Sequence, residues 1–446
     1  MKIAIIGAGW AGMAAAVEAT KAGHHAIVFE ASRAIGGRAR ALNGTLPDGT
    51  PVTLDNGQHI LIGAYTETLR LMRLVGVQPQ TALLSLPMTM LFPDGQGLRF
   101  PAWPTPLDAL AGIVAARGWS VADKWSLLRV ATGWQRSGFQ CDPAASVAML
   151  CQSLRQRVLA ELIGPLCVSA LNTPPERASG QVFLRVVQDA LFGVQGGSRL
   201  LLPRVDLSAL FPQAAARLLA ARGGQTRLGT RVDSVQPQGS QWQLQGEDFD
   251  AVIFATSASE SALALENSSQ YAPNLVANRI QQWTRITRAL QFEAITTVYA
   301  WGPGAALPQP MLSLRSNPAA PAQFVFDRGQ LGGPQGLLAF VVSASAGGRE
   351  ALQAQVLTQA RQQLGLRLQA VQTVVEKRAT FACTPALQRP GLHIAPGLVA
   401  CGDYVEGPYP ATLEGAVRSA MAAVKTAIYD ATQKSFQDKT DKDGKR

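Results

Sequence analysis

The chain has 446 residues, more than a single compact core usually contains, so we expect two domains. Hydrophobic residues make up 47% and charged residues only 16%, yet no uninterrupted apolar run reaches the length of a transmembrane helix, which argues against an integral membrane protein. The net charge is +10, but the sequence has no zinc pattern, no RNP-type aromatic run and no dense basic block in its folded part, so we expect no nucleic-acid partner. Anionic lipid is the better candidate partner, although a merely basic surface explains the charge equally well.

The cysteines and histidines form no recognisable binding pattern. The five cysteines are odd in number and lack C-x-x-C spacing. We expect no secretory signal at residues 1–19, because its removal would delete the first predicted strand. Reduced thiols in a cytoplasmic protein are therefore expected. The four histidines lack ligand spacing, so we expect no metal site.

The first forty residues predict a nucleotide-binding βαβ half-unit. Residues 2–6 form a short apolar run typical of a buried parallel strand, and an Ala-rich helix follows. A second strand at 26–29 ends in Glu30. A G-x-G-x-x-G pattern lies between the strands and comprises Gly7, Gly9 and Gly12. The strand, the helix and the acid at these distances predict a dinucleotide site.

Each residue of this pattern has a physical role. Gly7 permits the tight turn, Gly9 lets the backbone approach a pyrophosphate, and Gly12 lets the helix and strand pack closely. The helix N-terminus offers free N–H groups and the positive end of its dipole to the phosphates. Glu30 is expected to accept hydrogen bonds from a ribose 2′-hydroxyl, and its charge disfavours a 2′-phosphate.

A second element that can contact phosphate follows the acid directly. It reads G-G-R-A-R and contains Gly36, Gly37, Arg38 and Arg40. Paired glycines bring the backbone close to a ligand, and arginines two positions apart can both reach phosphate oxygens. With this element the sequence resembles the flavin amine oxidase and phytoene desaturase superfamily, whose FAD motif has the same order. The resemblance implies FAD as the cofactor; the alternative is a basic surface loop.

A middle segment resembles the second FAD motif of this superfamily. We expect an Ala/Leu-rich helix at 209–222, ended by a glycine pair, and two short strands within 225–235. The resemblance implies that the backbone of Val232 contacts adenine. A strand at 249–256 then completes this segment.

The C-terminal segment resembles the third FAD motif. A strand at 398–401 precedes Gly402 and Asp403, and a long helix of small residues is expected from about Ala411. The resemblance places Asp403 beside the ribityl–pyrophosphate region of FAD. It also places Ala411 and Thr412 at a helix N-terminus whose dipole stabilises negative charge on the reduced flavin.

These motifs predict an α/β fold: a Rossmann-like FAD-binding domain of the GR2 type with an inserted α+β substrate domain. The FAD-binding domain is expected to be discontinuous, with the segments 1–76, 196–262 and 385–432. The substrate domain is expected to comprise 77–195 and 263–384. The charged segment 433–446 is predicted to be a disordered tail.

The helical segment 101–139 carries half of the tryptophans of the chain, interleaved with arginine and lysine; they are Trp103, Trp119, Trp125 and Trp134. Tryptophan beside basic residues on apolar helices suits a membrane interface. A peripheral site on the inner face of the membrane, at the mouth of a tunnel for a lipid substrate, is one interpretation. Ordinary helices with aromatic residues in the core are the other. Further helices are expected at 146–170 and 181–192.

The loop 54–61 carries a D-x-G-x-H pattern formed by Asp55, Gly57 and His59. It resembles the isoprenoid-processing members of the superfamily more than the amine oxidases. An aspartate four residues before a histidine forms an acid–base pair if the loop folds back. A structural turn with Asx-type hydrogen bonds is equally consistent with the pattern.

The D-x-G-Q-H pattern, the Trp-rich insert and the ending G-P-Y-P-A-T-L-E-G-A-V-x-S resemble the bacterial hydroxysqualene dehydroxylase family. This resemblance implies removal of an allylic hydroxyl from a long apolar isoprenoid by hydride from reduced flavin. Candidates for the general acid are Asp55, His59 and Tyr409. Because no second nucleotide-binding motif is evident, the electrons are expected to come from an external donor.

Two other classes remain open. The first is an oxidising enzyme, either a carotenoid desaturase or a flavin amine oxidase. The second is a carrier of prenyl lipids that has the same fold and performs no chemistry. The intact G-G-R-A-R element and the Gly402-Asp403 pair favour a bound flavin and so argue against the carrier.

Overall fold

The computed structural model of the chain describes residues 1–104 and 106–443, with side chains described as far as residue 433. A six-stranded sheet has the order β10-β2-β1-β14-β21-β20. Its parallel strands are β1 (Lys2–Ile6), β2 (His25–Glu30), β10 (Gln225–Leu228), β14 (Ala251–Phe254) and β21 (Leu398–Ala400), and β20 (His393–Ala395) pairs antiparallel to β21. This sheet and the β1-α1-β2 connection confirm the predicted Rossmann-like α/β fold.

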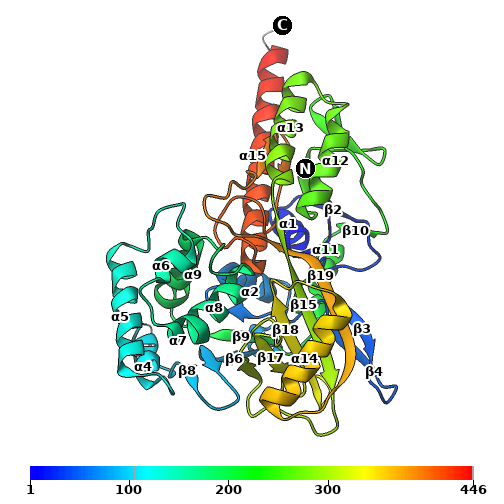
Figure 1. Cartoon of the computed structure of the whole chain (residues 1–446). Coiled ribbons are helices and arrows are strands. Elements are labelled where there is room, and N and C mark those ends of the chain that lie inside the picture. The colour runs from blue at the N-terminus through cyan, green and yellow to red at the C-terminus, as the bar shows by residue number, and fades with distance from the viewer. Residues whose placement is uncertain (105, 444–446) are drawn as a thin grey trace.

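Alternate residues of β1 face the two sides of this sheet, as a strand requires. Ile3 and Ile5 are buried with the helices α1 (Trp10–Lys21), α11 (Pro212–Ala221) and α15 (Leu413–Asp443). Ala4 and Ile6 face the small sheet of β11 (Gln236–Gln238), β12 (Gln241–Leu244) and β13 (Glu247–Phe249). Figure 1 shows α15 as a long helix that runs past α1. The sheet is therefore covered on both faces, which is usual for parallel strands.

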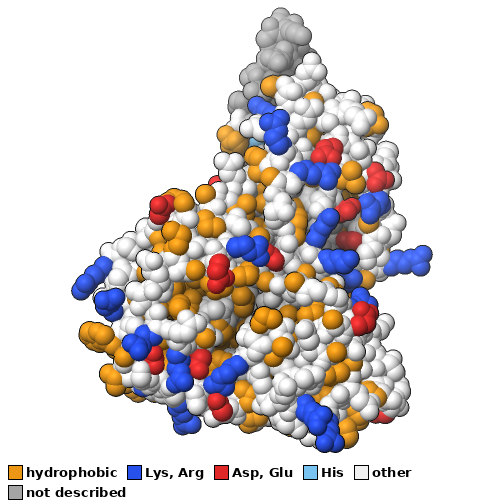
Figure 2. Space-filling model, viewed as in Figure 1, with side chains coloured by type: hydrophobic (Ala, Val, Ile, Leu, Met, Phe, Trp, Pro, Cys, Tyr) orange, Lys and Arg blue, Asp and Glu red, His pale blue; other side chains and the backbone are white. Residues whose placement is uncertain are grey.

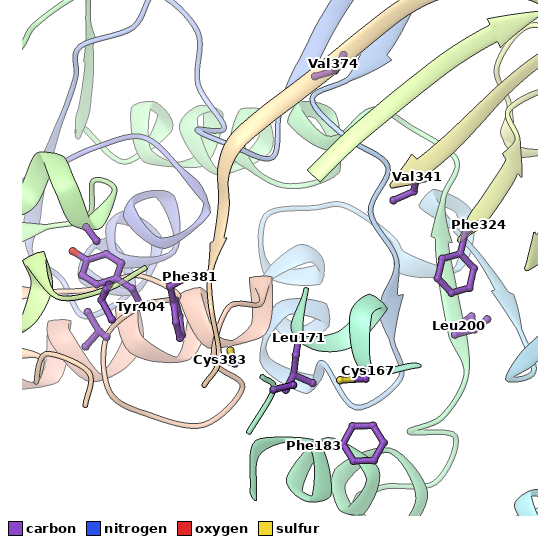
Figure 3. Packing of buried hydrophobic residues seen from close by; sticks show 14 of the residues in the cluster. Cys167, Leu171, Phe183, Leu200, Phe324, Val341, Val374, Phe381, Cys383 and Tyr404 are labelled. Atoms are coloured by element: carbon purple, nitrogen blue, oxygen red, sulfur yellow. The ribbon is translucent and has the colours of Figure 1, made fainter. Parts of the chain in front are cut away.

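A second, antiparallel sheet has the order β16-β17-β18-β15-β19. Its strands are β15 (Phe292–Trp301), β16 (Met311–Ser313), β17 (Phe324–Asp327), β18 (Leu337–Ser343) and β19 (Gln369–Phe381). The helix α14 (Arg349–Leu364) covers one face, where Phe340 and Val356 share a buried cluster. The other face turns toward the interior, where Phe324, Val341 and Val374 belong to the same buried cluster as Cys167, Leu171 and Phe183 of the helices. Figure 3 shows residues of this cluster from both the sheet and the helices.

Helices and short strands complete the structure on the other side of this second sheet (Figure 1). The helices are α4 (Leu107–Ala115), α5 (Val121–Arg136), α6 (Val147–Cys151), α7 (Gln156–Val158), α8 (Gly164–Leu171) and α9 (Gly180–Gln188), with π-turns at Leu159–Ile163 and Asp189–Gly193. The short strands are β5 (Leu61–Ile62), β6 (Leu83–Leu86), β7 (Thr89–Leu91), β8 (Gly97–Arg99) and β9 (Leu200–Pro203). The remaining elements are β3 (Ala41–Thr45), β4 (Pro51–Asp55), α2 (Thr66–Leu74), α3 (Pro79–Ala82), α10 (Leu207–Leu210), α12 (Ala258–Ser269), α13 (Asn274–Arg288) and a 3-10 turn at Gly329–Leu331.

Two predicted helices are interrupted. The helix expected at 209–222 is divided into α10 and α11, because Pro212 begins α11 and has no N–H with which to continue the preceding helix. The helix expected at 146–170 is divided into α6, α7, a π-turn and α8. There Pro165 lies in the first turn of α8, where a missing N–H costs nothing.

The prediction of two strands within 225–235 is wrong in its second half. Only β10 forms, and the chain turns at Gly229, whose φ is +65°. The N–H of Thr230 then bonds to the carbonyl of Glu30 at 2.9 Å, so the segment continues as a loop beside the end of β2. The long helix near the C-terminus begins at Leu413 rather than at Ala411.

The predicted domain limits can be placed on these elements. The limit at residue 262 falls within α12, and its neighbour α13 packs against β20 of the six-stranded sheet. The helix α15 extends to Asp443, into the 433–446 segment for which disorder is predicted, and residues 444–446 lie outside the described part of the chain. The division into two domains remains a prediction.

Candidate active site

The glycine turn after β1 leaves no room for side chains. The φ of Gly7 is +108°, and a Cβ on Gly7 would lie 2.8 Å from the carbonyl oxygen of Ala255. A Cβ on Gly12 would lie 1.8 Å from the carbonyl oxygen of Gly7. Both distances are shorter than any normal contact, so the turn brings β1, α1 and β14 closer together than alanine permits. Gly12 thus has the packing role predicted for it.

The G-G-R-A-R element lies directly across this turn. The N–H of Gly36 bonds to the carbonyl of Ala8 at 2.8 Å, and a Cβ on Gly37 would lie 3.1 Å from the Cα of Gly9. Glu30 accepts hydrogen bonds from the N–H groups of Ala8 at 2.7 Å and Ser32 at 2.8 Å. The first predicted motif is therefore one continuous structure, formed by residues that lie more than twenty positions apart.

Arg38 joins the first and third predicted motifs. Its Nη2 lies 2.5 Å from Oδ1 of Asp403, and its Nη1 donates to the carbonyl of Ala379 at 2.5 Å. The carboxylate of Asp403 raises the pKa of Arg38, although burial opposes this effect. Gly402 is fixed by the Ser419 hydroxyl, which accepts from its N–H at 2.9 Å. Arg40 instead bonds to the carbonyl of Gly37 at 2.5 Å.

Two helix N-termini meet at the same cavity. The first is that of α1, where Gly9 is the N-cap and supplies no side-chain acceptor. The second is that of α15, where the Thr412 hydroxyl accepts from the N–H of Gly415 at 3.0 Å and so caps the first turn. Ala411, just before this cap, has a φ of +59°, which is strained for a residue with a side chain. Both N-termini present positive dipole ends to a bound anion.

The cavity between these elements has a volume of about 480 Å³, and residues of three kinds line it. Glu30, Arg38 and Arg231 are charged, and the glycine turn presents backbone without side chains. The apolar lining residues include Ile60, Phe324, Val341 and Val374. A cradle of glycines with both charged and apolar surroundings fits an extended dinucleotide that carries phosphates and a ring system. The residues present therefore fit FAD.

Thirteen residues are predicted to bind FAD, and the structure brings twelve of them to this cavity. The lining contains Gly7, Gly9, Glu30, Gly36, Gly37, Arg38, Arg40, Val232, Gly402, Asp403, Ala411 and Thr412. Gly12 is the exception, because it packs behind the turn. The individual roles in binding remain predictions.

A second, apolar cavity of about 410 Å³ adjoins the first. Its lining comes from α4, α5, α8, α9 and the second sheet, and none of the described residues in it is charged. Figure 2 shows a hollow in which hydrophobic side chains gather. Six residues line both cavities, namely Ile60, Tyr65, Ser169, Ala170, Phe324 and Thr412. The hydroxyls of Tyr65, Ser169 and Thr412 are therefore the polar side-chain groups at this junction.

Asp55, the first predicted acid, lines neither cavity. Its Oδ1 accepts from the N–H of Leu207 at 2.8 Å, and its Oδ2 lies 3.9 Å from Nη2 of Arg328. The Tyr299 hydroxyl donates to the backbone carbonyl of Asp55 at 3.0 Å. These contacts support the structural interpretation of the D-x-G-x-H loop: Asp55 anchors the loop from behind. It does not pair with His59.

The buried position of Asp55 predicts a specific pH effect. Burial raises the pKa of its carboxyl from 3.8 to about 6, against the opposing hydrogen bond from Leu207. The folded state therefore binds a proton that the unfolded state releases, so this group's contribution to stability falls as pH rises from about 4 to 6. Asp55→Asn is expected to remove this pH-dependent decrease in the free energy of unfolding, which amounts to about 3 kcal/mol. Urea unfolding of both proteins at pH 4 and pH 7 measures it, and an identical pH dependence in the two would contradict the prediction.

His59 lines the first cavity alone. Its Nδ1 lies 3.0 Å from the carbonyl oxygen of Gly57, which requires the proton on Nδ1 and leaves Nε2 as an acceptor. Burial lowers the pKa of His59, and the nearby Arg38 guanidinium lowers it further. A neutral imidazole is a poor general acid at neutral pH.

Tyr409, the third predicted acid, lines the apolar cavity only. Burial and the Asp189 carboxylate, which is hydrogen-bonded to it, raise the pKa of Tyr409 to about 12. Its ring lies 6.1 Å from that of Tyr65, edge to face. The structure thus places the three predicted acids at three separate positions, and none of them at the junction of the cavities.

Tyr65 is the residue that sequence reasoning missed. It lines both cavities and hydrogen-bonds with Thr412, and burial raises its pKa above the ordinary value of 10. The hydroxyl therefore keeps its proton at physiological pH. Its position six residues after His59, at the end of an apolar run, was the available signal.

The described residues contain neither a membrane-spanning helix nor a metal-binding group of side chains. None of the helices there combines the length and apolar character needed to cross a bilayer. No group of three or more His, Cys, Asp or Glu side chains in the same residues is arranged to hold a metal ion.

The fold and the site together define an FAD-dependent oxidoreductase. The chain belongs to the family of flavin containing amine oxidoreductases, whose model matches residues 10–428. Similar solved structures include an oxidoreductase from Methanosarcina mazei, with a TM-score of 0.70 and 16% identity over 95% of this chain and 100% of that one. Putrescine oxidase bound to putrescine has a TM-score of 0.64 and 14% identity over 96% of this chain and 99% of that one. At such identities the likeness concerns the fold alone.

Similar curated sequences carry two names. Hydroxysqualene dehydroxylase of Rhodopseudomonas palustris is 27% identical over 95% of this chain and 97% of its own. The protein of the same name from Zymomonas mobilis is 24% identical over 95% of this chain and 98% of its own. Zeta-carotene desaturase of a Synechocystis species is 40% identical, but over only 19% of this chain and 16% of its own.

Proposed function

We propose that this protein removes the allylic hydroxyl of hydroxysqualene to give squalene. The observation that carries the proposal is the uncharged cavity of about 410 Å³ that meets the FAD cavity at three hydroxyl groups. A long hydrocarbon with one hydroxyl group matches a largely apolar cavity that has hydroxyl groups where it meets the FAD cavity. Two relatives that match nearly the whole chain bear the corresponding name, which supports the same substrate.

The reaction breaks the allylic C–O bond, with both electrons going to the oxygen. The oxygen takes up a proton that passes through the Tyr65 hydroxyl, which regains its own proton from solvent, and leaves as water. FAD, when bound and reduced, supplies the hydride for the new C–H bond. We assign to Tyr65 the hydrogen bond to the departing oxygen, because its hydroxyl lies at the junction and remains protonated. The Thr412 hydroxyl donates its own proton to the Tyr409 carbonyl at 2.7 Å, so the Tyr65 proton turns from Thr412 to the departing oxygen when the substrate binds. The electrons come from an external donor.

The surrounding residues favour a cationic transition state. The apolar lining keeps water from recapturing an allylic cation. The rings of Tyr65 and Phe324 line both cavities, and an aromatic face attracts positive charge. No described residue with a formal charge lines the apolar cavity, so the stabilisation of the cation there depends on the aromatic rings.

The test is an anaerobic incubation of the purified protein with chemically reduced flavin and hydroxysqualene, followed by lipid analysis. We expect squalene, and we expect Tyr65→Phe to lower the rate about 100-fold or more, the usual cost of removing one such donor. The flavin absorbance of the purified Tyr65→Phe protein should match that of the wild type, because the substitution removes only a hydroxyl. Tyr271→Phe is the matched control, since Tyr271 is exposed and lines neither cavity.

Two results would contradict the proposal. The first is aerobic desaturation of a carotenoid precursor with no squalene formed, which would identify a desaturase. The second is a protein that retains isoprenoid but contains no flavin, which would identify a carrier. A wild-type rate for Tyr65→Phe would exclude the assigned role of Tyr65 alone.

A further inference from the structure

An exposed apolar patch lies on α4 and the beginning of α5. Its members expose between 48% and 84% of their surface, and they are Trp103, Leu107, Leu110, Val114, Val121 and Trp125. We call this set the α4–α5 patch. Figure 2 shows hydrophobic side chains at the edge of the molecule where Figure 1 labels α4 and α5. Large apolar side chains gathered in this way normally mark a contact surface.

The patch arises from the two faces of α4. Leu107, Leu110 and Val114 follow one another at helical spacing on the outer face, whereas Ala109 and Gly112 are buried on the inner face. The other two tryptophans of the segment, Trp119 and Trp134, belong to the core. The core interpretation of the Trp-rich segment therefore applies to Trp119 and Trp134, whereas Trp103 and Trp125 are exposed.

The patch is continuous with the apolar cavity. Leu107 and Leu110 are exposed and also line that cavity, together with Ile113 of the same helix. A hydrocarbon lying against α4 thus reaches the cavity without crossing a charged surface. Val121 and Trp125, by contrast, line neither cavity and serve only the outer surface.

The exposed charge of the segment that carries the patch is positive. Residues 101–140 contain two acids, Asp108 and Asp123, and both are buried. Asp123 forms a capping box with Ser120 at the start of α5. The basic side chains of the same segment reach the surface, and they are Arg117, Lys124, Arg129 and Arg136. An apolar surface bordered by basic residues matches a bilayer with anionic headgroups.

We propose that the α4–α5 patch docks on an anionic phospholipid bilayer, with the apolar cavity opening toward the lipid. A second copy of the chain is a poorer partner, because a symmetric dimer would bring the basic side chains of both copies together. The docking surface does not depend on which apolar substrate the protein uses, so its test is separate from that of the proposed function.

The test is sedimentation of the flavin-containing protein with vesicles of phosphatidylcholine, with or without about a third of phosphatidylglycerol. We expect binding to the anionic vesicles, weakened by salt. Val121→Ser with Trp125→Ser should weaken this binding about 100-fold, because each side chain contributes about tenfold when it leaves water. Leu275→Ser with Tyr271→Ser is the matched control, since these residues are also exposed, at 67% and 55%, and lie at α13 and just before it, away from α4 and α5 in Figure 1.

The folding of both double variants is checked by flavin absorbance and by thermal unfolding, which should match those of the wild type. Unchanged vesicle binding by Val121→Ser with Trp125→Ser would overturn the proposal. Equal binding to vesicles with and without phosphatidylglycerol would overturn its electrostatic part. A lipid-free dimer that the same two substitutions dissociate would show that a second copy covers the patch, which also overturns it.

Discussion

Replacing Gly12 by alanine is expected to give a protein without FAD. The new Cβ would lie 1.8 Å from the carbonyl oxygen of Gly7 and 3.2 Å from the Cβ of Ala255. The nearest of these atoms is backbone and cannot rotate away, so α1 must separate from β1. We expect a loss of stability of about 3 kcal/mol or more, at the upper end for overpacked sites. The measurements are the flavin absorbance of the purified protein and its unfolding in urea.

Alanine variants of two further glycines distinguish a loss of stability from a loss of FAD affinity. Gly9→Ala meets nothing closer than the Cα of Gly37 at 3.8 Å, so this variant should fold normally and lose affinity for added FAD. Gly133 in α5 has no atom within 4 Å of its would-be Cβ. Alanine there should be neutral or stabilise by up to about 1 kcal/mol. A yellow Gly12→Ala protein of wild-type stability would refute the packing argument.

Removing the carboxylate of Glu414 is expected to have the second large effect, on stability. Glu414 is completely buried in the first turn of α15. It accepts from the N–H of Glu67 at 3.1 Å and from the N–H and hydroxyl of Thr68 at 2.9 and 2.7 Å. Arg418 donates to it at 2.7 Å. This one carboxylate therefore caps α2 and pairs with a cation, which fixes α2 against α15.

Glu414→Ala should lower the free energy of unfolding by about 3–5 kcal/mol, the range for breaking a buried pair. Glu414→Gln keeps the shape and one acceptor, so it should cost less. Glu350→Ala is the control, because Glu350 is an exposed acid in the first turn of α14. Urea unfolding measures all three variants. If Glu414→Ala unfolds at the same urea concentration as Glu350→Ala, the carboxylate does not hold the helices together.

The Glu414 contacts have a consequence for the site. They hold the N-terminus of α15 at the cavity, directly after a loop in which Tyr409 and Ala411 have φ values of +57° and +59°. Such a conformation is strained for residues with side chains and persists only where the surroundings enforce it. The Ala411 N–H bonds to the carbonyl of Asp403 at 3.1 Å, and the Thr412 hydroxyl donates to the Tyr409 carbonyl at 2.7 Å. These bonds and the anchored helix keep Thr412 next to Tyr65.

The sequence by itself was sufficient for the dinucleotide-binding half of the site. Its evidence is local: the spacing of Gly7, Gly9 and Gly12, the acid at the end of the second strand, and the element that ends in Arg40. Backbone conformation and phosphate contact depend on residue types at fixed short distances, so such patterns can be read without knowing the fold. The same holds for β1, whose bounds agree with the prediction, and for β2, which is one residue longer at each end than predicted.

The positions of the candidate catalytic side chains could not be predicted from the sequence, because they depend on contacts between segments far apart in the chain. Asp55 and His59 are four residues apart, yet Asp55 is turned toward Arg328 and Leu207, whereas His59 lines the FAD cavity. Tyr65 became a candidate only because α8, β17 and α15 bring Ser169, Phe324 and Thr412 beside it. Burial, which decides the pKa of each of these groups, results from packing between elements far apart in the chain. Residue spacing therefore predicted the residues that line the FAD cavity, and only the tertiary structure decided which side chains lie where this cavity meets the apolar one.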